Sequence, residues 1–575
     1  MKVKLQRKLL LFTILCVHIT STFAVPQNRI PDADRDYVNI DTECGPVEGK
    51  RFTENVKWHN DSVNVYEFRN IPYAKPPVGK LRWRPPVRLS DDPAQCWDGV
   101  LKYNKNVVAC KQDHPFTPSV NTSEDCLVLT VRTPNLDPSS KLPVIVWIHG
   151  GGMLWGYNEM FAFHPDTEFS AYMEAVTVSI NYRLNVFGFM SLKELWIENG
   201  PNKSYGNYGI LDQIETLKWV KSNIKQFGGD SENVMIYGES GGGTGVYCLL
   251  CSPLANGLFQ KASPQSGAPN IRTTHEVADM KYRSIIDKAD CQKESPDNIV
   301  ECLQNIDADD FLSLFKGTSV TPYHWKMPTN EPYNGYPVEI LDPVVVTKSP
   351  DQIPVHQNTQ VELLIGNCAQ ETGPFPHKPK PDANITTWAD LQAALEPQMD
   401  TFKKGHYPHF LDQYQNDLKS PPQNITPKYV YEVMTSDALV LCTTNYVADH
   451  LSKVKGYTVS RYVMSQPPTK EIGLGLETAY HGWDSVLLFG LKFYKGETLP
   501  EEDEKLMKLF RGMYKDFLFS NFMTQFQGKT TDFWAGFTRS EQGMLTYHQN
   551  RCEMWNELGI LNHSWGNLGY PASDD

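Results

Sequence analysis

The chain has 575 residues, of which 40% are hydrophobic and 11% are aromatic. This composition provides enough apolar side chains for a large buried core, and it excludes a disordered or collagen-like chain. Acidic residues number 67 and basic residues 54, which gives a formal net charge of −13. A surface that follows nucleic-acid phosphates needs a basic excess, so nucleic acid is not an expected partner.

Residues 1–24 have the pattern of a secretory signal peptide. Four basic residues lie within 1–8, residues 9–20 are mostly apolar, and the small residue Ala24 ends the segment. The apolar run is shorter than the ~20 residues that a membrane-spanning helix needs. No second long apolar run follows. We expect cleavage after Ala24, no membrane span, and a secreted domain of residues 25–575.

Six Asn-x-Ser/Thr sequons are candidate glycosylation sites and are typical of secreted proteins. They begin at Asn60, Asn121, Asn202, Asn384, Asn424 and Asn562. The fifth is weakened by the proline that follows it. Eleven of the 12 cysteines lie after the signal segment, so at least one is not paired within the chain. Cys248 and Cys251 have CxxC spacing, but their apolar neighbours favour two buried thiols over a redox motif.

Strand and helix patterns alternate along the chain. An amphipathic helix is expected over 210–227, closed by two glycines. Buried strands are expected at 144–148, 176–180, 234–237, 363–366 and 457–464. This alternation predicts an α/β fold with an open, mostly parallel central sheet and helices on both faces. We interpret the Pro-rich stretch 373–422 as a surface insertion, because the sheet pattern resumes after it.

A G-x-S-x-G motif, Gly238-Glu239-Ser240-Gly241-Gly242, lies between the strand that ends at 237 and a helical segment at 246–250. In a tight strand-to-helix turn, small residues must flank the serine, which projects above the edge of the sheet. The following helix N-terminus favours developing negative charge. This context favours a nucleophilic Ser240 over an ordinary Gly-rich turn.

His149-Gly150-Gly151-Gly152 follows the strand at 144–148. Bare glycine backbone lets N–H groups approach a carbonyl oxygen, and an acyl-transfer enzyme needs such donors where the tetrahedral oxyanion forms. The expected donors are the amides of Gly151, Gly152 and Gly241. A glycine run after one strand and a serine turn after a later strand form a specific combination.

Further motifs follow one another in the same order as in one known family. They are Asn70-Ile71-Pro72-Tyr73-Ala74, Pro76-Pro77-Val78-Gly79, Ser123-Glu124-Asp125-Cys126-Leu127, Asn181-Tyr182-Arg183-Leu184, Gly206-Asn207-Tyr208-Gly209, Leu211-Asp212-Gln213, Phe227-Gly228-Gly229-Asp230 and Gln265-Ser266-Gly267. With the Ser240 and His149 motifs, they make the chain resemble the type-B carboxylesterase/cholinesterase family of the α/β-hydrolase superfamily. The resemblance covers nearly all of residues 25–575 and implies an α/β-hydrolase fold.

The resemblance also implies the partners of Ser240. The acid falls at Glu371 and the base at His481, in the chain order Ser, acid, His of this fold. A serine hydroxyl is a poor nucleophile, so an imidazole must take its proton and a carboxylate must orient that imidazole. Asp437 is a rival acid, although its surroundings look structural in the family.

The family pattern also implies disulfides between Cys110 and Cys126, Cys291 and Cys302, and Cys442 and Cys552. A fourth pair, Cys44 with Cys96, is suggested only by the cysteines left over. The chain departs from the family at Gly241, where Ala is usual, at Met153, where Phe is frequent, and at 483–485, where a more acidic run is usual. These departures bear on the shape of the acyl pocket.

The expected function is that of a secreted serine esterase that hydrolyses small carboxylic esters through an acyl-enzyme. That chemistry requires no metal and no cofactor, and the oligomeric state is not predicted. One alternative is a catalytically silent adhesion protein that resembles the neuroligins, and another is lipase or cholinesterase specificity. The loop 110–126 contains no Trp to hold a quaternary ammonium, so neutral esters are the expected substrates.

Overall fold

A computed structural model describes most of the chain. The described residues are 36–58, 62–113, 120–160, 163–196, 204, 206–315, 327, 335–355, 360–372, 385–418, 425–469, 478–490, 500–519, 529–534, 537–542, 548–563 and 569–571. The expected signal segment, 1–24, lies outside them, as do four of the sequons, namely Asn60, Asn202, Asn384 and Asn424. Asn121 is described and exposed, whereas the side chain of Asn562 is not described.

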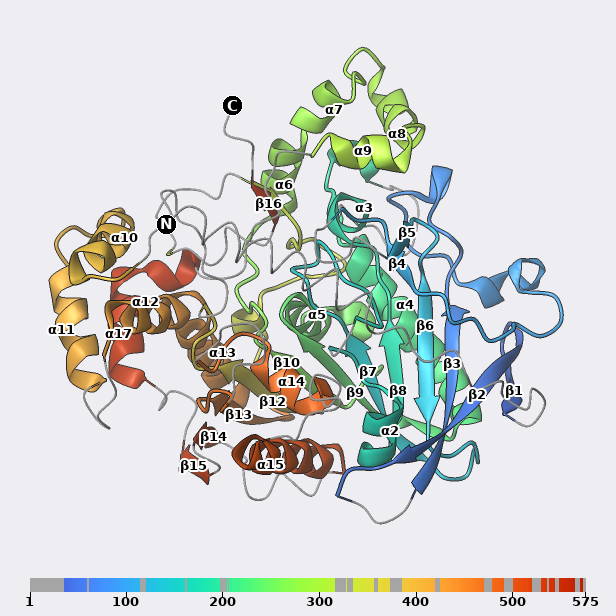
Figure 1. The fold of residues 1–575 in the computed structure, drawn as a ribbon. Helices are drawn as coiled ribbons and strands as arrows, with labels where there is room; N and C mark the ends of the chain where they lie inside the picture. Colours follow the sequence, from blue (N-terminus) through green and yellow to red (C-terminus); the bar gives the residue numbers. More distant parts are fainter. Residues whose placement is uncertain are drawn as a thin grey trace, which may run out of the picture. The chain divides into compact units, whose positions relative to one another are not determined.

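Within the described residues, one 12-stranded sheet forms the centre of the fold, in the order β1-β2-β3-β6-β8-β7-β9-β10-β12-β13-β14-β15 (Figure 1). Its middle strands run parallel to one another: β8 (Val176–Ile180), β7 (Leu142–Ile148), β9 (Gly229–Glu239), β10 (Lys261–Gln265), β12 (Val361–Cys368), β13 (Tyr457–Met464) and β14 (Lys529–Trp534). The outer strands are β1 (Tyr37–Thr42), β2 (Gly45–Asn55), β3 (Ser62–Pro72), β6 (Val128–Thr133) and β15 (Phe537–Gln542).

The outer part of the sheet contains the antiparallel pairs, which are β2 with β3, β3 with β6, β6 with β8, and β14 with β15. The sheet is therefore mixed but mostly parallel, as the sequence predicts. Two small two-stranded sheets lie apart from it. They pair β4 (Val108–Cys110) with β5 (Asn121–Ser123), and β11 (Gly335–Pro337) with β16 (Gly569–Pro571).

Every strand expected from the sequence lies within a strand of the parallel part. In β8 all residues are buried, and in β7 all but the first are buried. Such nearly continuous burial is typical of parallel strands that are covered on both faces. The helix expected over 210–227 is α4 (Tyr208–Asn223), followed by a 3₁₀ turn, Ile224–Phe227.

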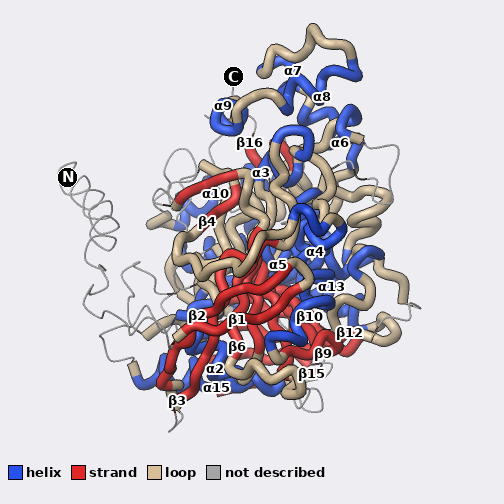
Figure 2. Tube along the Cα trace, turned by 90° about the vertical axis from the view of Figure 1, so that its right-hand side faces the viewer, coloured by secondary structure: helices blue, strands red, loops and turns tan. Residues whose placement is uncertain are grey.

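Helices cover both faces of this sheet (Figures 1 and 2). On one face lie α2 (Thr167–Met173), α14 (Trp483–Phe489) and α15 (Glu501–Leu518), whose apolar side chains share a core with those of β7 and β9. In that core, the rings of Trp147 and Tyr237 have centroids 4.9 Å apart, and Phe489 lies 5.1 Å from Trp147. On the other face lie α4, α5 (Gly241–Leu250) and α13 (Cys442–Ser452). The alternation of strands and helices thus produces the two-sided arrangement that was expected.

The stretch 373–422 contains two helices that the sequence analysis did not predict. They are α10 (Trp388–Asp400) and α11 (Tyr407–Asp417), which share a second core with α12 (Pro427–Ser436) and α17 (Gln549–Leu558) around the buried Trp555. Prolines hide the helical pattern, because Pro397 lies inside α10 and Pro408 lies in the first turn of α11. The sheet does resume afterwards, since β13 pairs with β12, and the stretch is therefore an insertion as expected.

The other α-helices among the described residues are short. They are α3 (Asn185–Phe189), α6 (His275–Tyr282), α7 (Ser284–Lys288), α8 (Pro296–Gln304) and α9 (Ala308–Ser313). The described residues from Asn39 onward form one compact unit. In the part of the chain that the structure describes, each helix is too short or too polar to cross a lipid bilayer.

Four disulfides connect the described residues. They join Cys44 to Cys96, Cys110 to Cys126, Cys291 to Cys302, and Cys442 to Cys552, which are the pairs named from the sequence. The free cysteines among the described residues are Cys248, Cys251 and Cys368, and all three are buried. The CxxC pair therefore consists of two buried thiols, as its apolar neighbours indicate.

The disulfides should differ in their contribution to stability. In the chain-entropy model, a bridge across ~100 residues contributes about 4.7 kcal/mol and one across ~15 residues about 3 kcal/mol. Cys442 and Cys552 are separated by 110 residues, and Cys291 and Cys302 by 11. The double variant C442A/C552A should therefore lower the free energy of unfolding more than C291A/C302A does. Urea denaturation without reductant measures both losses, and equal losses would contradict the entropic account.

Candidate active site

Ser240 lies in the turn between β9 and α5. Its backbone has φ 58° and ψ −123°, a conformation that residues with a side chain rarely adopt. Two backbone hydrogen bonds fix the turn: Ser240 N–H donates to the Gln265 carbonyl at 2.9 Å, and the Ser240 carbonyl accepts from Thr244 N–H at 3.0 Å. The half-buried Ser240 is therefore held at the N-terminus of α5 in the strained geometry of a nucleophile elbow.

The flanking glycines are required by close backbone contacts. A Cβ at Gly238 would collide with the backbone of Gly242, and one at Gly242 would collide with the carbonyl of Ile148 at the end of β7. Only glycine, which has no Cβ, leaves room for the turn to pass so close to the end of β9 and to the end of the neighbouring strand β7. The G-x-S-x-G pattern thus has the steric cause expected from the sequence.

The segment after β7, residues 149–156, is called the glycine loop here. It lies against the Ser240 turn, because a Cβ on Gly150 would be 3.1 Å from the Ser240 Cβ. A Cβ on Gly241 would be 2.7 Å from the Met153 nitrogen and 2.8 Å from the Gly152 nitrogen. The backbone nitrogens of Gly152 and Met153 therefore lie close to Gly241. The Met153 nitrogen was not among the expected donors.

Gly151, the remaining expected donor, adopts φ 104°, a conformation that favours glycine. A side chain there would collide with the carbonyl of Trp155 in the same loop. The loop is thus tightly folded: Leu154 N–H and Trp155 N–H both donate to the Gly151 carbonyl, at 3.0 and 3.2 Å. Glycine at 151 is needed for the loop to close on itself.

His481 and Glu371 form a buried hydrogen-bonded pair. The His481 Nδ1 lies 2.6 Å from the Glu371 Oε2. The other oxygen, Oε1, accepts hydrogen bonds from the Ser266 hydroxyl at 2.7 Å and from the Cys368 N–H at 2.9 Å. Glu371 is 0% exposed, so these bonds replace the water that a carboxylate otherwise needs. Together they fix the orientation of both side chains.

Gln370 holds the two segments of this pair together. Its backbone N–H donates to the Ala479 carbonyl at 3.0 Å, and its side-chain oxygen accepts from Ala479 N–H at 3.0 Å. Because Gln370 adjoins Glu371 and Ala479 is two residues before His481, this double contact sets the spacing between acid and imidazole. The role of Gln370 follows from the tertiary contact and was not visible in the sequence.

Asp437, the rival acid, lies in a π-helical turn, Asp437–Leu441, that follows α12. Its oxygens contact His548 Nδ1 at 2.9 Å and the Tyr414 hydroxyl at 2.7 Å, and Arg551 lies 3.6 Å away. Asp437 therefore belongs to a separate buried cluster. The structure pairs His481 with Glu371 and not with Asp437.

Two further acids near His481 have no role in the mechanism expected from the sequence. Glu239 Oε1 lies 3.1 Å from His481 Nε2, and Asp484 is buried and accepts a hydrogen bond from the Tyr462 hydroxyl at 2.9 Å. Burial raises the pKa of Glu239 to about 7, although His481 opposes the rise. Burial also raises the pKa of Asp484 to about 6, and the charge of Glu371 adds to that effect.

The acids also affect the imidazole. Burial disfavours the charged form of His481, but the carboxylates of Glu239 and Glu371 outweigh burial and raise its pKa above the ordinary value. Glu239 occupies the variable position of G-x-S-x-G beside Ser240, and no local pattern in the sequence predicts its contact with His481. Among the described residues, no three His, Cys, Asp or Glu side chains converge in a way that could hold a metal ion.

A strained serine turn, a glycine loop beside it and a buried Glu–His pair on one α/β sheet define the class of α/β-hydrolases. The sequence profile of the carboxylesterase family matches residues 36–560. The chain belongs to the carboxylesterase family.

Several known proteins are similar to the chain. Liver carboxylesterase 1F of Rattus norvegicus is 34% identical over 352 residues, 58% of this chain and 59% of that protein. Cocaine esterase of Oryctolagus cuniculus is 28% identical over 488 residues, 81% and 84% of the two chains. A solved structure of PNB esterase superposes with a TM-score of 0.66 at 25% identity and covers 89% of this chain and 99% of the other. The alignment with the liver carboxylesterase thus spans less than two thirds of that protein.

The close approach at Gly241 leads to a stability prediction. An alanine there must displace the backbone of residues 152–153, and overpacking of this kind typically costs about 1–3 kcal/mol. Gly512 in α15 is a matched control, since a Cβ there meets nothing within 4 Å and helix propensity favours alanine by roughly 1 kcal/mol. Thermal denaturation should therefore show a lower Tm for G241A and an equal or higher Tm for G512A. A G241A protein as stable as the wild type would show that the loop shifts without cost.

Proposed function

We propose that the protein hydrolyses carboxylic esters, with Ser240 as nucleophile, His481 as general base and Glu371 as the carboxylate that orients His481. The observation that carries this proposal is the 2.6 Å hydrogen bond between buried Glu371 and His481. Glu371 follows β12 just as Ser240 follows β9, so the pair and the serine turn lie at the same edge of the sheet. That bond leaves Nε2 as the imidazole nitrogen that takes the serine proton.

In this mechanism, Ser240 attacks the ester carbonyl while His481 takes its proton. The negative charge that develops on the carbonyl oxygen is stabilised by the amides of Gly151, Gly152 and Gly241, and the Met153 nitrogen close to Gly241 is a further candidate. His481 then returns the proton to the leaving alcohol, and an acyl-enzyme forms. Water, activated by the same imidazole, hydrolyses the acyl-enzyme.

Secretion belongs to the same proposal. The signal pattern of residues 1–24 and the four disulfides both support passage through an oxidising compartment. The six sequons are the proposed glycosylation sites, and the exposed Asn121 is the one whose surroundings are described.

Two features favour an esterase over a silent adhesion protein. All three positions of the proposed triad carry residues that can perform the chemistry, and similar proteins have names that include liver carboxylesterase, para-nitrobenzyl esterase and cocaine esterase.

Neutral esters are the proposed substrates, because the loop 110–126 offers no Trp or Tyr to a quaternary ammonium.

The nucleophile can be tested directly. Because acyl transfer requires the hydroxyl, Ser240→Ala should lower kcat for an aryl ester by about 10⁴-fold or more. An organophosphate should label the wild type at Ser240, as mass spectrometry of peptides would detect, and should abolish hydrolysis. His481→Ala and Glu371→Ala should also have a low kcat. Their circular dichroism spectra should match that of the wild type, because the fold is kept. Unchanged turnover in purified Ser240→Ala would refute the assignment.

Glu239 should set the pH at which activity appears. His481 must be neutral to act as a base, and the carboxylate of Glu239 helps to raise its pKa. In Glu239→Gln the charged imidazolium loses that support and releases its proton at lower pH. The acid limb of the kcat/KM profile should therefore move to lower pH. Glu174→Gln, which removes the charge of a largely exposed carboxylate, is the control and should leave the limb in place. A shift to higher pH in Glu239→Gln would contradict the role given to Glu239.

A further inference from the structure

The glycine loop is held at its far end by one buried amide side chain. Gln112 accepts a hydrogen bond from Gly156 N–H at 2.8 Å and donates to the Gly156 carbonyl at 2.8 Å. The same amide nitrogen donates to the Cys110 carbonyl at 2.9 Å. Gln112 is 5% exposed, so water does not replace these bonds easily. A primary amide can pair with both groups of one residue, whereas glutamate lacks the donor and methionine lacks both functions.

A second residue joins the same two segments. Asn185 N–H donates to the Met153 carbonyl at 2.7 Å, and its side-chain nitrogen donates to the Leu154 carbonyl at 3.2 Å. That nitrogen also donates to the carbonyl of Lys111, the neighbour of Gln112, at 2.8 Å. Asn185 is buried and begins α3 at φ 48°. The glycine loop is thus joined to the Cys110–Cys126 segment directly at Gly156 and, through Asn185, at residues 153–154.

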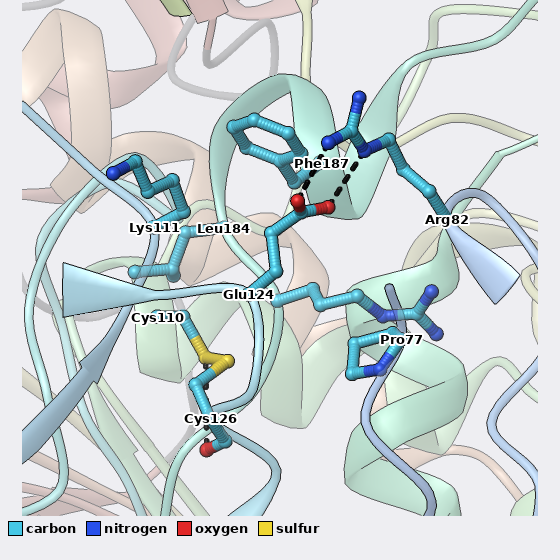
Figure 3. Close-up of a pocket in the computed structure, with 9 residues that line it drawn as sticks. Pro77, Arg82, Cys110, Lys111, Glu124, Cys126, Leu184 and Phe187 are labelled. Atoms are coloured by element: carbon cyan, nitrogen blue, oxygen red, sulfur yellow. Dashed lines mark hydrogen bonds and ion pairs between the residues drawn. A yellow bond between two sulfur atoms is a disulfide. The ribbon is translucent and has the colours of Figure 1, made fainter. Parts of the chain in front are cut away.

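The two described ends of the Cys110–Cys126 segment, residues 110–113 and 120–126, are themselves anchored to the body of the protein. The disulfide joins these two ends, and β4 and β5 pair beside the disulfide. Glu124, two residues before Cys126, forms a bidentate ion pair with the buried Arg82, with N···O distances of 2.6 and 2.7 Å. Figure 3 shows this ion pair and the disulfide around one small cavity, with Lys111 at its edge and Phe187 of α3 lining it. The segment that carries Gln112 is therefore fixed independently of the glycine loop.

We propose that Gln112 is a positioning residue for the glycine loop, and that through it the Cys110–Cys126 segment sets the geometry of the amides beside Ser240. This inference rests on the proposed ester hydrolysis. Oxyanion donors are effective only when they are already aimed at the place where the charge develops. Gly156 ends the short loop that contains Gly151, Gly152 and Met153, so a clamp at Gly156 limits how far these backbone groups can move.

The test replaces Gln112 with methionine, which keeps the length of the side chain and removes both hydrogen-bonding groups. Misplaced oxyanion donors typically cost about 10–100-fold in rate, so kcat for an aryl ester should fall by that factor in Gln112→Met. KM should stay within about twofold, because the lost interaction is used in the transition state. The Ki of a trifluoromethyl ketone, whose hemiketal carries an oxyanion, should rise by the same factor as kcat/KM falls.

Gln260→Met is the matched control. Gln260 also accepts a hydrogen bond from a backbone N–H, that of Val234 at 2.9 Å, but it lies one residue before β10 and pairs with β9 and not with the glycine loop. Its kcat and Ki should equal those of the wild type. Asn185→Asp provides a second variant if Gln112→Met fails to fold, since it removes the donor to Leu154 and Lys111 and keeps the shape. It should also lower kcat and raise Ki.

Hydrogen–deuterium exchange separates this inference from the proposed function. Peptides that cover residues 149–156 should exchange faster in Gln112→Met than in the wild type. In Gln260→Met they should exchange at the wild-type rate. Both expectations hold whether or not the protein hydrolyses an ester. If the wild type had no esterase activity, the proposed function would be refuted. The exchange rates would then still show whether Gln112 restrains the glycine loop. The inference alone would be overturned by a different result. In that result the wild type needs Ser240 for hydrolysis, but Gln112→Met has the exchange rate, kcat and Ki of the wild type.

Discussion

The hydrogen bond between the Glu371 carboxylate and His481 Nδ1 is the interaction on which the arrangement of the site depends. It joins residues that are 110 positions apart in the chain, and both side chains are buried. A carboxylate without water is stable only when other donors satisfy its oxygens, and here Ser266 and Cys368 supply them. Strands β10 and β12 and the segment before α14 must all be in place for this one bond to form.

The parallel part of the sheet brings these groups to a common edge. The glycine loop follows β7, Ser240 follows β9, Ser266 follows β10 and Glu371 follows β12. Parallel strands place their carboxyl ends on the same side, so four separate segments meet without a long loop. The same convergence gathers the carboxylates of Glu239 and Glu371 around one imidazole. That concentration of negative charge explains why the pKa of His481 is raised in spite of burial.

Local signals allowed much of this to be predicted from the sequence. The Ser240 turn and the glycine run depend on contacts within a few residues of two strands, and both motifs carry small residues for a steric reason. Glu371 and His481 came only from family resemblance, because a lone acid or imidazole has no local pattern. Ser266, Gln370 and Gln112 were missed because their roles are tertiary hydrogen bonds to residues 44 to 109 positions away. Helices α10 and α11 were missed because prolines obscure their periodicity.

The fold protects the three buried thiols from disulfide exchange. Burial raises the pKa of Cys248, Cys251 and Cys368 well above the ordinary value, so in the native protein they are poor nucleophiles toward disulfides. An unfolded chain has no such protection, and the eleven cysteines after residue 24 can pair in many wrong ways under oxidising conditions. Packing of helix α5 and strand β12 removes these three thiols from further exchange. Cys368 matters most, because its backbone N–H donates to the carboxylate that holds His481, and a mispaired disulfide there would displace that contact.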